Sequence, residues 1–480
     1  MTVAEILRAL GRPGPIEGPG AAALVGAFSV DSRTVVASGG FAALAGERVD
    51  GHRYVARAIE NGARVALVSR PVEGPAMVQL DDKAPVPDPP LQIVVDDVLA
   101  ALQRIARWLR AERPDLRVVG VTGSVGKTTT KDAIAAVLGQ RYATLRNSGN
   151  RNNEIGLPLT LSEIQPEHQV AVLEMGMYDL GEIALLCDIA RPQVGVVTNV
   201  GPTHLERLGT IERIAQAKAE LVQALPRDGI AVLNGDDQRV AAMAAVSQAP
   251  CATYGLAAEG LTFCAMDIES HGLKGIAFTV REEPRGDLGL DGSTKRLRCR
   301  MIGEHAIWPS LAAVAVARLE GLTWEEIERG LLALGPGPRL VPRQGRDGVL
   351  VLDDSYNASP VSGHAALDAL AQLEGRKVAI LGDMLELGAA EEAGHLEVGR
   401  HCAQVADRLL AVGELSRGIV RGALGAGMPQ ERISWVADGD QALAALDALV
   451  APGDLVLVKA SRGIALESLV RHLMGEQGDA

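Results

Sequence analysis

One stretch of the chain decides the fold: Thr122-Gly123-Ser124-Val125-Gly126-Lys127-Thr128-Thr129-Thr130. It follows the apolar run 118–121, so a short buried strand is predicted to lead through a glycine turn into a helix. Such a turn wraps a nucleotide triphosphate, because backbone N–H groups at the helix N-terminus hold phosphate oxygens. Lys127 would neutralise the outer phosphates, and the Thr128 hydroxyl would ligate Mg²⁺. We therefore expect the chain to use ATP or GTP. The predicted contacts are Gly123, Ser124, Gly126, Lys127, Thr128 and Thr129.

The match is to the short pattern G-x-x-G-K-[ST]. The longer pattern has a glycine six residues before the lysine, where this chain has Val121. The alternative is a chance glycine turn ahead of a helix with a solvated lysine. That alternative requires a strand, a turn, a Lys-Thr pair and a helix to follow one another by accident.

Composition limits the class of protein. A chain of 480 residues is expected to form two to four domains, each with its own core. The net charge of −13, without a long Lys/Arg cluster, argues against nucleic acid as the main partner. The five cysteines are far apart and form no C-x-x-C pair, so neither a zinc site nor a disulfide framework is indicated. We expect no signal peptide, no membrane span and a reducing cytoplasm.

The order of predicted strands and helices gives an α/β fold class with three domains. Residues 1–97 alternate short strands with a helix near 54–61, and an amphipathic helix over 97–113 leads into the phosphate loop. Strands and helices then alternate up to about residue 335, with continuous apolar runs typical of buried parallel strands. The predicted domains are 1–97, 98–335 and 336–480.

Two segments modify this pattern. Short alternating runs over 251–302 predict an antiparallel appendage to the central parallel sheet. The stretch Leu334-Gly335-Pro336-Gly337-Pro338 predicts a linker, and a hinge is plausible at 335–338. The last third has strand candidates at 349–352, 378–381, 408–412 and 455–458, which predict a Rossmann-like, doubly wound sheet.

Two strand ends in the central domain carry residues suited to metal chemistry. Glu174 directly follows the apolar strand 170–173, where a carboxylate beside a phosphate loop ordinarily binds Mg²⁺. His204 lies on the loop after the strand 194–197; a lone histidine is more often structural, and Mg²⁺ prefers oxygen ligands. Lys218 lies on the following helix, and its ordinary interpretation from the residues alone is an exposed helix lysine.

Three further loops have the composition of ligand sites. Asn150, Asn152 and Asn153 lie in a loop whose amides can donate and accept, although a cluster of Asx turns is an equal interpretation. Segments 353–360 and 381–388 each follow a predicted strand, where open sheets bind ligands. The alternative for both is a capped turn.

These motifs, in this order, resemble the Mur ligase family, the ATP-dependent amide-bond ligases of peptidoglycan precursor synthesis, over nearly the whole chain. Asp31-Ser32-Arg33 with the segment 46–52 looks like the UDP-binding first domain of the branch that adds D-alanyl-D-alanine. Asp-Ser-Tyr-Asn-Ala at 354–358 and Leu-Gly-Asp-Met-Leu-Glu-Leu-Gly at 381–388 look like its third domain and are the most specific matches. The diaminopimelate- or lysine-adding relative would carry Asp-Asn-Pro-Arg, which is absent from this sequence.

The resemblance implies a substrate pair and a mechanism. ATP phosphorylates the carboxylate of UDP-N-acetylmuramoyl-tripeptide (UDP-MurNAc-tripeptide), the amine of D-Ala-D-Ala attacks the acyl phosphate, and a tetrahedral intermediate collapses to amide and phosphate. Each step develops negative charge on oxygen, so two Mg²⁺ ions and Lys127 are the natural stabilisers. The third residue of the tripeptide, diaminopimelate or lysine, stays open. We expect a monomer, although no feature of the sequence decides it.

The resemblance also assigns roles to single residues. Thr128 and Glu174 serve one Mg²⁺ and His204 the second, which accounts for the unusual histidine. Lys218 matches the family's carbamylated lysine, in which CO₂ on a neutral amine makes an oxygen ligand; this reverses the exposed-lysine interpretation. The residues assigned to the nucleotide are His305, Arg339 and Asp354, and those assigned to the other substrates are Ser32, Arg33, Asn150, Asn152, Asn153, Tyr356, Asn357, Lys459 and Arg462.

Three positions depart from the family pattern. Pro309 stands where an asparagine next to adenine is usual, Ser359 replaces the second asparagine of the Asp-Ser-Tyr-Asn-Ala-Asn loop, and Ala460 replaces a glycine. These changes put the adenine and dipeptide contacts in doubt. None touches the phosphates or the metals, so we expect an active enzyme.

Other functions remain to be weighed. A folylpolyglutamate-synthetase-type ligase, or another Mur-type ligase, would share the central fold, but the former would lack the UDP-binding domain and carry Asp-Gly-Ala-His at 354–357. A GTPase switch would carry Asn-Lys-x-Asp, which does not occur. An inactive binding module is opposed by the intact Lys127, Glu174, His204 and Lys218.

Overall fold

The computed structural model describes residues 1–46, 49–203, 205–256, 259–335 and 339–476. The chain packs into two compact units. The first contains residues 1–120, 142–177 and 181–193, and the second contains residues 121–141, 178–180 and 194–480. The three domains expected at 1–97, 98–335 and 336–480 stay a prediction.

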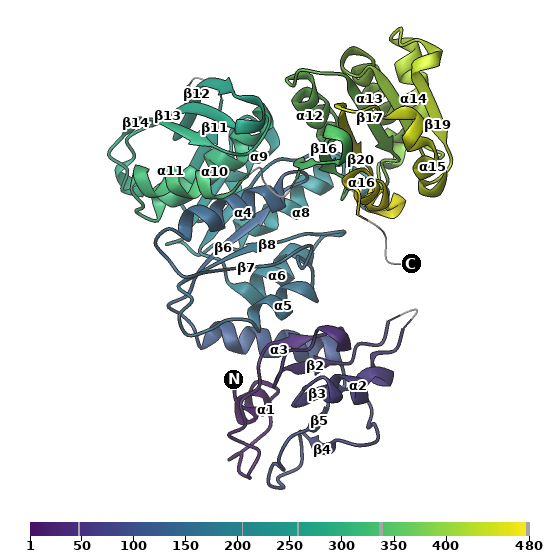
Figure 1. Ribbon diagram of the computed structural model, residues 1–480. Helices are drawn as coiled ribbons and strands as arrows, with labels where there is room; N and C mark the ends of the chain where they lie inside the picture. The colour runs from purple at the N-terminus through teal and green to yellow at the C-terminus, as the bar shows by residue number, and fades with distance from the viewer. Residues whose placement is uncertain (47–48, 204, 257–258, 336–338, 477–480) are drawn as a thin grey trace. The chain divides into compact units, whose positions relative to one another are not determined.

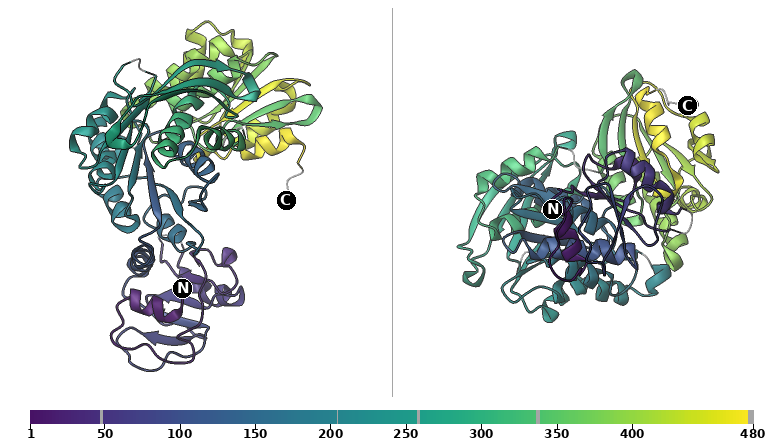
Figure 2. Two further views of the ribbon diagram at one scale, coloured as in Figure 1. Left: turned by 90° about the vertical axis from the view of Figure 1, so that its left-hand side faces the viewer. Right: turned by 90° about the horizontal axis from the view of Figure 1, so that it is seen from below.

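The first unit begins with a parallel sheet of strand order β1-β2-β3-β5-β4. Alternate residues of a strand point to opposite faces, and this sheet has a core on each face. Val65 and Leu67 pack with α1 and α3, whereas Ala66 and Val68 pack with α2. Figure 2 shows this sheet, in purple, from two further directions. The elements are α1 (Val3–Ala9), β1 (Phe28–Ser29), β2 (Gly40–Ala42), α2 (Val55–Glu60), β3 (Val65–Val68), β4 (Ala76–Gln79), β5 (Leu91–Val94) and α3 (Val98–Ala111).

The helix expected over 97–113 is confirmed as α3. The Asp97 carboxylate caps it by accepting from the backbone N–H of Ala100 at 3.0 Å. The Arg110 side chain is buried and donates to the Ala190 carbonyl at 2.8 Å, so a charged residue anchors the last turn to α6. The remaining elements of this unit are β7 (Thr144–Arg146), α5 (Gly156–Leu161), β8 (Val170–Glu174) and α6 (Glu182–Ala190), together with most of β6 (Arg117–Thr122).

The central sheet has nine strands in the described part of the chain, in the order β14-β13-β12-β11-β10-β9-β6-β8-β7. The antiparallel part expected over 251–302 is confirmed for β12 to β14. It starts one strand later than expected, because β11 pairs in parallel with both β10 and β12. Up to residue 335, the strands and α-helices of the second unit are α4 (Lys127–Leu138), β9 (Val194–Val197), α7 (Leu205–Leu208), α8 (Ile211–Gln223), β10 (Ile230–Asn234), α9 (Gln238–Ala242), β11 (Cys251–Gly255), β12 (Phe263–Ser270), β13 (Ile276–Glu282), β14 (Ser293–Cys299), α10 (Ile307–Leu319) and α11 (Trp324–Ala333).

The C-terminal sheet has the order β15-β16-β20-β17-β18-β19 and is covered on both faces (Figure 1). One core joins it to α12, α13 and α14, and the other joins it to α15 and α16. Strand β17 serves both, since Ala379 and Leu381 belong to the first core and Val378 and Ile380 to the second. The doubly wound sheet is therefore confirmed, with antiparallel β15 at its edge. Its elements are β15 (Val341–Gln344), β16 (Leu350–Asp354), α12 (Pro360–Ala371), β17 (Lys377–Gly382), α13 (Glu391–Val405), β18 (Arg408–Val412), α14 (Arg417–Gly425), β19 (Ile433–Val436), α15 (Gly439–Leu449), β20 (Leu455–Lys459) and α16 (Glu467–Met474).

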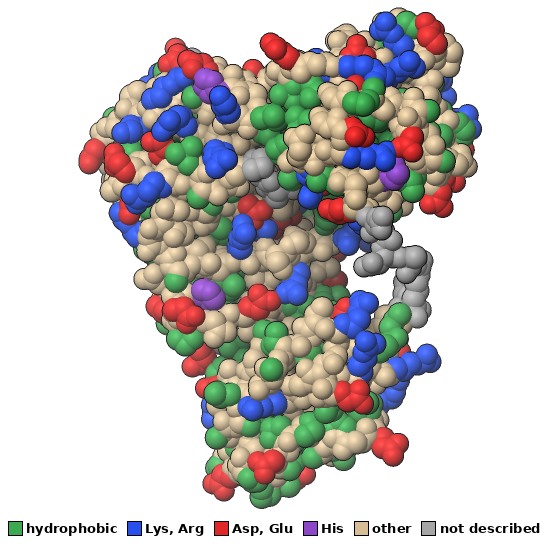
Figure 3. Space-filling model, viewed as in Figure 1, with side chains coloured by type: hydrophobic (Ala, Val, Ile, Leu, Met, Phe, Trp, Pro, Cys, Tyr) green, Lys and Arg blue, Asp and Glu red, His purple; other side chains and the backbone are tan. Residues whose placement is uncertain are grey.

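The face of the molecule seen in Figure 3 carries charged side chains of both signs. Acidic and basic side chains are interspersed over the face seen in Figure 3, without a large patch of one sign. Among the described residues, no helix combines the length and the apolar character needed to cross a membrane.

Candidate active site

The phosphate loop has the backbone geometry that its glycines predict. Gly123 has φ +150°, and a Cβ there would overlap the Thr198 hydroxyl, so no larger residue fits. Gly126 lies in the left-handed region at φ 82° and caps α4, and the space in front of it is open. The loop therefore has the glycine conformation that leads into the N-terminus of α4, as in an anion-binding turn.

A second loop, residues 198–203, braces the phosphate loop. The Asn199 side chain accepts from the Val125 N–H at 2.8 Å and donates to the Val125 carbonyl at 2.9 Å. The Ser124 hydroxyl donates to the Gly201 carbonyl at 3.0 Å and accepts from the Gly201 N–H at 2.8 Å. Asn199 contacts the phosphate loop but was not singled out by the sequence analysis, although its place two residues after the end of β9 was a usable signal.

Lys127 and Lys218 lie close enough for their charges to interact. The Lys127 amine donates to the carbonyls of Gly123 at 2.8 Å and Ser124 at 3.1 Å. Lys218, on α8, is buried with 2% of its surface exposed. Burial and then the Lys127 charge hold the pKa of the Lys218 amine well below its usual value. A neutral amine in this position is the form that can react with CO₂.

The interpretation of Lys218 as an exposed helix lysine is wrong. The buried residues of α8 include Ile214, Ala217, Leu221 and Val222, which form the inward stripe of the helix. Lys218 lies four residues after Ile214 and three before Leu221, so the helical period puts it on that same stripe. The resemblance to a family with a modified lysine had already favoured this outcome.

Thr128 and Thr129, in the first turn of α4, are half-buried beside the phosphate loop. His204 lies outside the described residues, so its predicted role stays a prediction. No group of three or more His, Cys, Asp and Glu side chains suited to a metal ion occurs in the parts of the chain that the structure describes. The candidate ligands Thr128 and Glu174 offer oxygen donors, which suits Mg²⁺.

Glu174 ends β8 and is held by two asparagines of its own unit. The Asn152 amide donates to its carboxylate at 2.8 Å, and the Asn147 side chain accepts from its backbone N–H at 2.9 Å. Asn147 is buried and also donates to the Glu174 carbonyl at 3.2 Å. Asn147 is a second residue that the sequence analysis missed; its only signal was its place beside the amide-rich loop.

The other amides of that loop have different surroundings. The Asn153 side chain accepts from the Gly156 N–H at 2.9 Å at the start of α5, so it acts as a local turn residue. Asn150 is exposed. The structure thus brings Asn152 to Glu174 and leaves Asn150 at the surface.

In the C-terminal sheet, Asp354 ends β16 and Lys459 ends the neighbouring β20. The Lys459 amine donates to the Asp354 carboxylate and, at 2.9 Å, to the Asn357 carbonyl. Burial lowers the pKa of the Lys459 amine, and the Asp354 charge opposes this shift. The second carboxylate oxygen of Asp354, Oδ1, is buried and has no hydrogen-bond partner among the described residues. A buried acceptor of this kind suits a donating group of a ligand.

Three cations gather at this sheet edge. The Arg339 guanidinium lies over the Tyr356 ring at 4.3 Å, and Arg462 lies over the same ring at 5.5 Å. The Arg339 charge also lowers the pKa of Lys459. One guanidinium nitrogen of Arg339, Nη1, is buried without a hydrogen-bond partner among the residues described. Exposed Asn357 completes the cluster, which suits an anionic ligand.

His305 lies at the start of α10 and is half-buried. Burial lowers the pKa of its imidazole; the Asp354 charge raises this pKa, and the Lys459 charge lowers it further. Pro309 is buried in the first turn of α10, where a missing N–H costs nothing. The neighbouring Trp308 donates its indole N–H to Asp236 at 2.7 Å, so this indole is held in place.

Ser32 and Arg33 form a short turn after β1. The Asp31 carboxylate caps the turn through the Arg33 N–H at 2.9 Å and also pairs with the Arg33 guanidinium at 2.6 Å. This pairing lowers the pKa of Asp31 to about 2. Ser32 is buried, and its carbonyl accepts from Asn61 at 2.8 Å. Arg33 is exposed and could meet a ligand.

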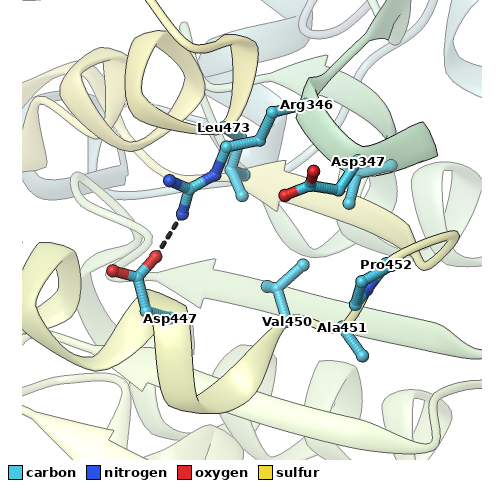
Figure 4. Close-up of a pocket in the computed structure, with 8 residues that line it drawn as sticks. Arg346, Asp347, Asp447, Val450, Ala451, Pro452 and Leu473 are labelled. Carbon is cyan, nitrogen blue, oxygen red and sulfur yellow. Dashed lines mark hydrogen bonds and ion pairs between the residues drawn. The ribbon is translucent and has the colours of Figure 1, made fainter.

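A surface hollow of about 290 Å³ lies away from the predicted site (Figure 4). Its lining includes Val349 and Pro452, which come just before β16 and β20. The hollow therefore lies at the amino ends of these two strands, whereas Asp354 and Lys459 lie at their carboxyl ends. Arg346 and Asp447 pair across it. Ligands of open α/β sheets bind at the carboxyl edge, so we give this hollow no part in the chemistry.

Comparisons with known proteins agree with this architecture. Three family models match the chain: "Mur ligase family, catalytic domain" over residues 25–109, "Mur ligase middle domain" over 121–317, and "Mur ligase, glutamate ligase domain" over 339–462. The chain is 37% identical to a UDP-N-acetylmuramoyl-tripeptide–D-alanyl-D-alanine ligase of Bacillus subtilis, with 90% of each chain covered.

Solved structures give the same result. A MurF structure from Acinetobacter baumannii superposes with a TM-score of 0.81 at 30% identity, covering 99% of this chain and 98% of that one. A MurF ligase of Thermotoga maritima, solved in complex with ADP, superposes with a TM-score of 0.75 at 28% identity, covering 94% and 97% of the two chains. On this evidence the chain belongs to the Mur ligase family.

Proposed function

We propose that this chain is an ATP-dependent ligase that adds D-alanyl-D-alanine to UDP-MurNAc-tripeptide, releasing ADP and phosphate. The observation that carries the proposal is the identity of 37% to a ligase of that name over 90% of both chains. The geometry of the phosphate loop and of the cationic cluster supports it. Such an enzyme would act on soluble precursors in the cytoplasm, as a monomer with domains at 1–97, 98–335 and 336–480.

The phosphate loop would bind the nucleotide. Gly123, Ser124, Gly126 and Thr129 would hold phosphate oxygens through the loop and the N-terminus of α4. Lys127 would exchange its present carbonyl partners for the β- and γ-phosphates. The solved relative in complex with ADP supports nucleotide use by this fold. His305, Arg339 and Asp354 would contact other parts of the nucleotide, and the unpartnered Asp354 oxygen suits a ribose hydroxyl.

Two Mg²⁺ ions would neutralise charge that develops on phosphate and carboxylate oxygens during transfer. Thr128, Glu174, His204 and Lys218 keep their roles as metal ligands in this proposal. For Lys218 the support is burial together with a pKa held well below its usual value, since a neutral amine can add CO₂ and become a carbamate. The carbamate has oxygen donors, whereas a protonated lysine has none.

The bond-forming chemistry balances without a further reactant. A carboxylate oxygen of the tripeptide takes the γ-phosphoryl group of ATP, and ADP leaves. The free amine of D-Ala-D-Ala then attacks the acyl carbon, loses a proton, and displaces inorganic phosphate. Lys459 and Arg462 would hold the dipeptide carboxylate, with Tyr356 and Asn357 beside it. Ser32, Arg33, Asn150, Asn152 and Asn153 would contact the UDP-linked substrate.

A direct assay tests the function. Phosphate release from ATP and Mg²⁺ is followed with UDP-MurNAc-tripeptide, with and without D-Ala-D-Ala, and the product is weighed by mass spectrometry. Release that requires both substrates, with a pentapeptide product, is the expected result. Running diaminopimelate- and lysine-containing tripeptides side by side identifies the third residue. Release that is indifferent to D-Ala-D-Ala, or that glutamate and a folate support instead, would refute the assignment.

A further inference from the structure

We propose that the Tyr356 ring is a positioning platform that holds Arg339 and Arg462, so that one aromatic side chain orders the cations serving two substrates. The proposal rests on the proposed function for the identity of those substrates. It rests on geometry for the platform itself. Tyr356 would thus act through the two arginines rather than on the reacting atoms.

Arg339 is held by its backbone neighbour, Leu340, and by the ring of Tyr356. The next residue, Leu340, is buried in the core of the C-terminal sheet and has φ 52°, in the left-handed region that a leucine rarely adopts. The Arg339 guanidinium then lies over the Tyr356 ring at 4.3 Å, well within cation–π range. Its Nη1 nitrogen is buried without a hydrogen-bond partner among the described residues. The ring is therefore the contact that orients this otherwise unpaired buried donor.

Arg462 reaches the same ring from a different segment. It follows Ser461, whose hydroxyl accepts from the Leu385 N–H at 3.0 Å, so the start of its turn is fixed. The Arg462 side chain itself is exposed, and its guanidinium lies 5.5 Å from the ring centroid. Arg339 and Arg462 thus bring two like charges to one ring, and Arg339 also repels Lys459. The negative face of an aromatic ring can hold two such charges in place at little cost.

The ring, rather than the hydroxyl, makes these contacts. Within the described residues, the Tyr356 hydroxyl has no hydrogen-bond partner, and 38% of the residue's surface is exposed. The backbone on both sides is anchored, since the Ser355 N–H donates to the Asp353 carboxylate at 3.2 Å and Ala358 is buried. A change of this side chain is therefore expected to leave the fold intact and to alter only what the ring touches.

Two matched variants test the platform. Tyr356→Phe keeps the ring, and Tyr356→Leu keeps apolar bulk without a π face. Calorimetry with ADP and Mg²⁺ reports on Arg339, and the KM for D-Ala-D-Ala reports on Arg462. We expect Tyr356→Leu to weaken each by roughly 3- to 30-fold and Tyr356→Phe to stay within about 2-fold of wild type. An equal loss in Phe and Leu variants, or no loss in the Leu variant, overturns the proposal.

A double-mutant cycle shows whether the ring acts through Arg339. In an Arg339→Met background, Tyr356→Leu should cause no further loss of ADP affinity, whereas independent effects would multiply and overturn the mechanism. Equal thermal unfolding midpoints exclude a general folding defect. Failure of the proposed function can be told apart from failure of the platform. A wild-type chain that binds ADP but makes no pentapeptide refutes the proposed function, while the ADP titrations still decide the platform.

Discussion

Lys218 on α8 and Lys459 at the end of β20 are both almost fully buried, with 2% and 3% of their surfaces exposed. Burial lowers the pKa of both amines, but their neighbours differ. Lys459 has the Asp354 carboxylate as an ion-pair partner, which opposes the lowering of its pKa. Lys218 has the charge of Lys127 nearby, which adds to the effect of burial. The neighbouring charge thus opposes the effect of burial on the pKa at Lys459 and reinforces it at Lys218.

The difference indicates what each region can do. A paired, charged lysine can bind an anion that arrives at the sheet edge, as a carboxylate or phosphate would. A buried lysine whose pKa is lowered further by a like charge, as at Lys218, loses its proton more readily, and only a neutral amine can react with CO₂. Burial alone therefore does not assign a role to a lysine; the nearest charge does.

The largest expected effect comes from breaking the paired lysine. Lys459→Met leaves the buried Asp354 carboxylate without its cation, which costs about 3–5 kcal/mol of unfolding free energy. Chemical denaturation of the variant and the wild type measures the loss. The double variant Lys459→Met/Asp354→Leu is the matched control and should recover most of it, because no unpaired charge remains. A single variant that loses less than about 1 kcal/mol would mean that the pair is far better solvated than its burial indicates.

Removing Lys218 should have the opposite effect on stability. Lys218→Met removes a buried amine without leaving an unpaired carboxylate, so we expect unchanged or higher stability. Catalysis should fall by roughly 10²–10³-fold, the usual loss when a charge-stabilising group is removed. Phosphate release measures the rate, and ADP binding checks the nucleotide site. Depleting CO₂ and bicarbonate should slow the wild type reversibly and leave the variant unaffected. Full activity in Lys218→Met would remove the carbamate from the mechanism.

Local patterns are what the sequence predicted well. The phosphate loop needs a strand, two glycines, Lys127 and Thr128 within a few residues, so each part can be seen in one stretch of sequence. The doubly wound C-terminal sheet was predictable because its buried strands are continuous apolar runs. The start of the antiparallel part was placed one strand early, since β11 alternates like an edge strand but pairs in parallel on both sides.

Contacts between distant segments could not be predicted in the same way. Asn199 bonds to Val125, 74 positions earlier, and nothing in either segment names the other. Asn147 fixes the backbone of Glu174 from a neighbouring strand end. The burial of Lys218 was only partly predictable from the sequence. Its helical period was present in the sequence, but a charged residue on an apolar stripe is ordinarily exposed.

A smaller effect is expected from Asn199, which holds the loop that carries Lys127, the charge that acts on Lys218. Asn199→Ala removes both hydrogen bonds to Val125 and leaves backbone groups unpaired, at a cost of about 1–3 kcal/mol. The dissociation constant for ADP should rise accordingly. Asn199→Asp keeps the acceptor and loses the donor, so its dissociation constant for ADP should lie between those of Asn199→Ala and the wild type. Equal ADP affinity in all three proteins would show that the loop is rigid without this brace.

The smallest effect is expected where a charge pair lies in water. Asp31 and Arg33 pair at 2.6 Å, but their side chains are 37% and 72% exposed, in contrast to Asp354 and Lys459. Asp31→Asn keeps the acceptor that caps the turn and removes only the charge, so the loss should be below about 1 kcal/mol. The pKa of Asp31 is lowered to about 2, so its contribution is present above about pH 4 and fades as the pH falls toward 2. Thermal unfolding of the variant and the wild type at pH 7 and pH 3 should therefore differ slightly at pH 7 and less at pH 3. A loss as large as that of Lys459→Met would show that distance, rather than burial, sets the worth of these pairs.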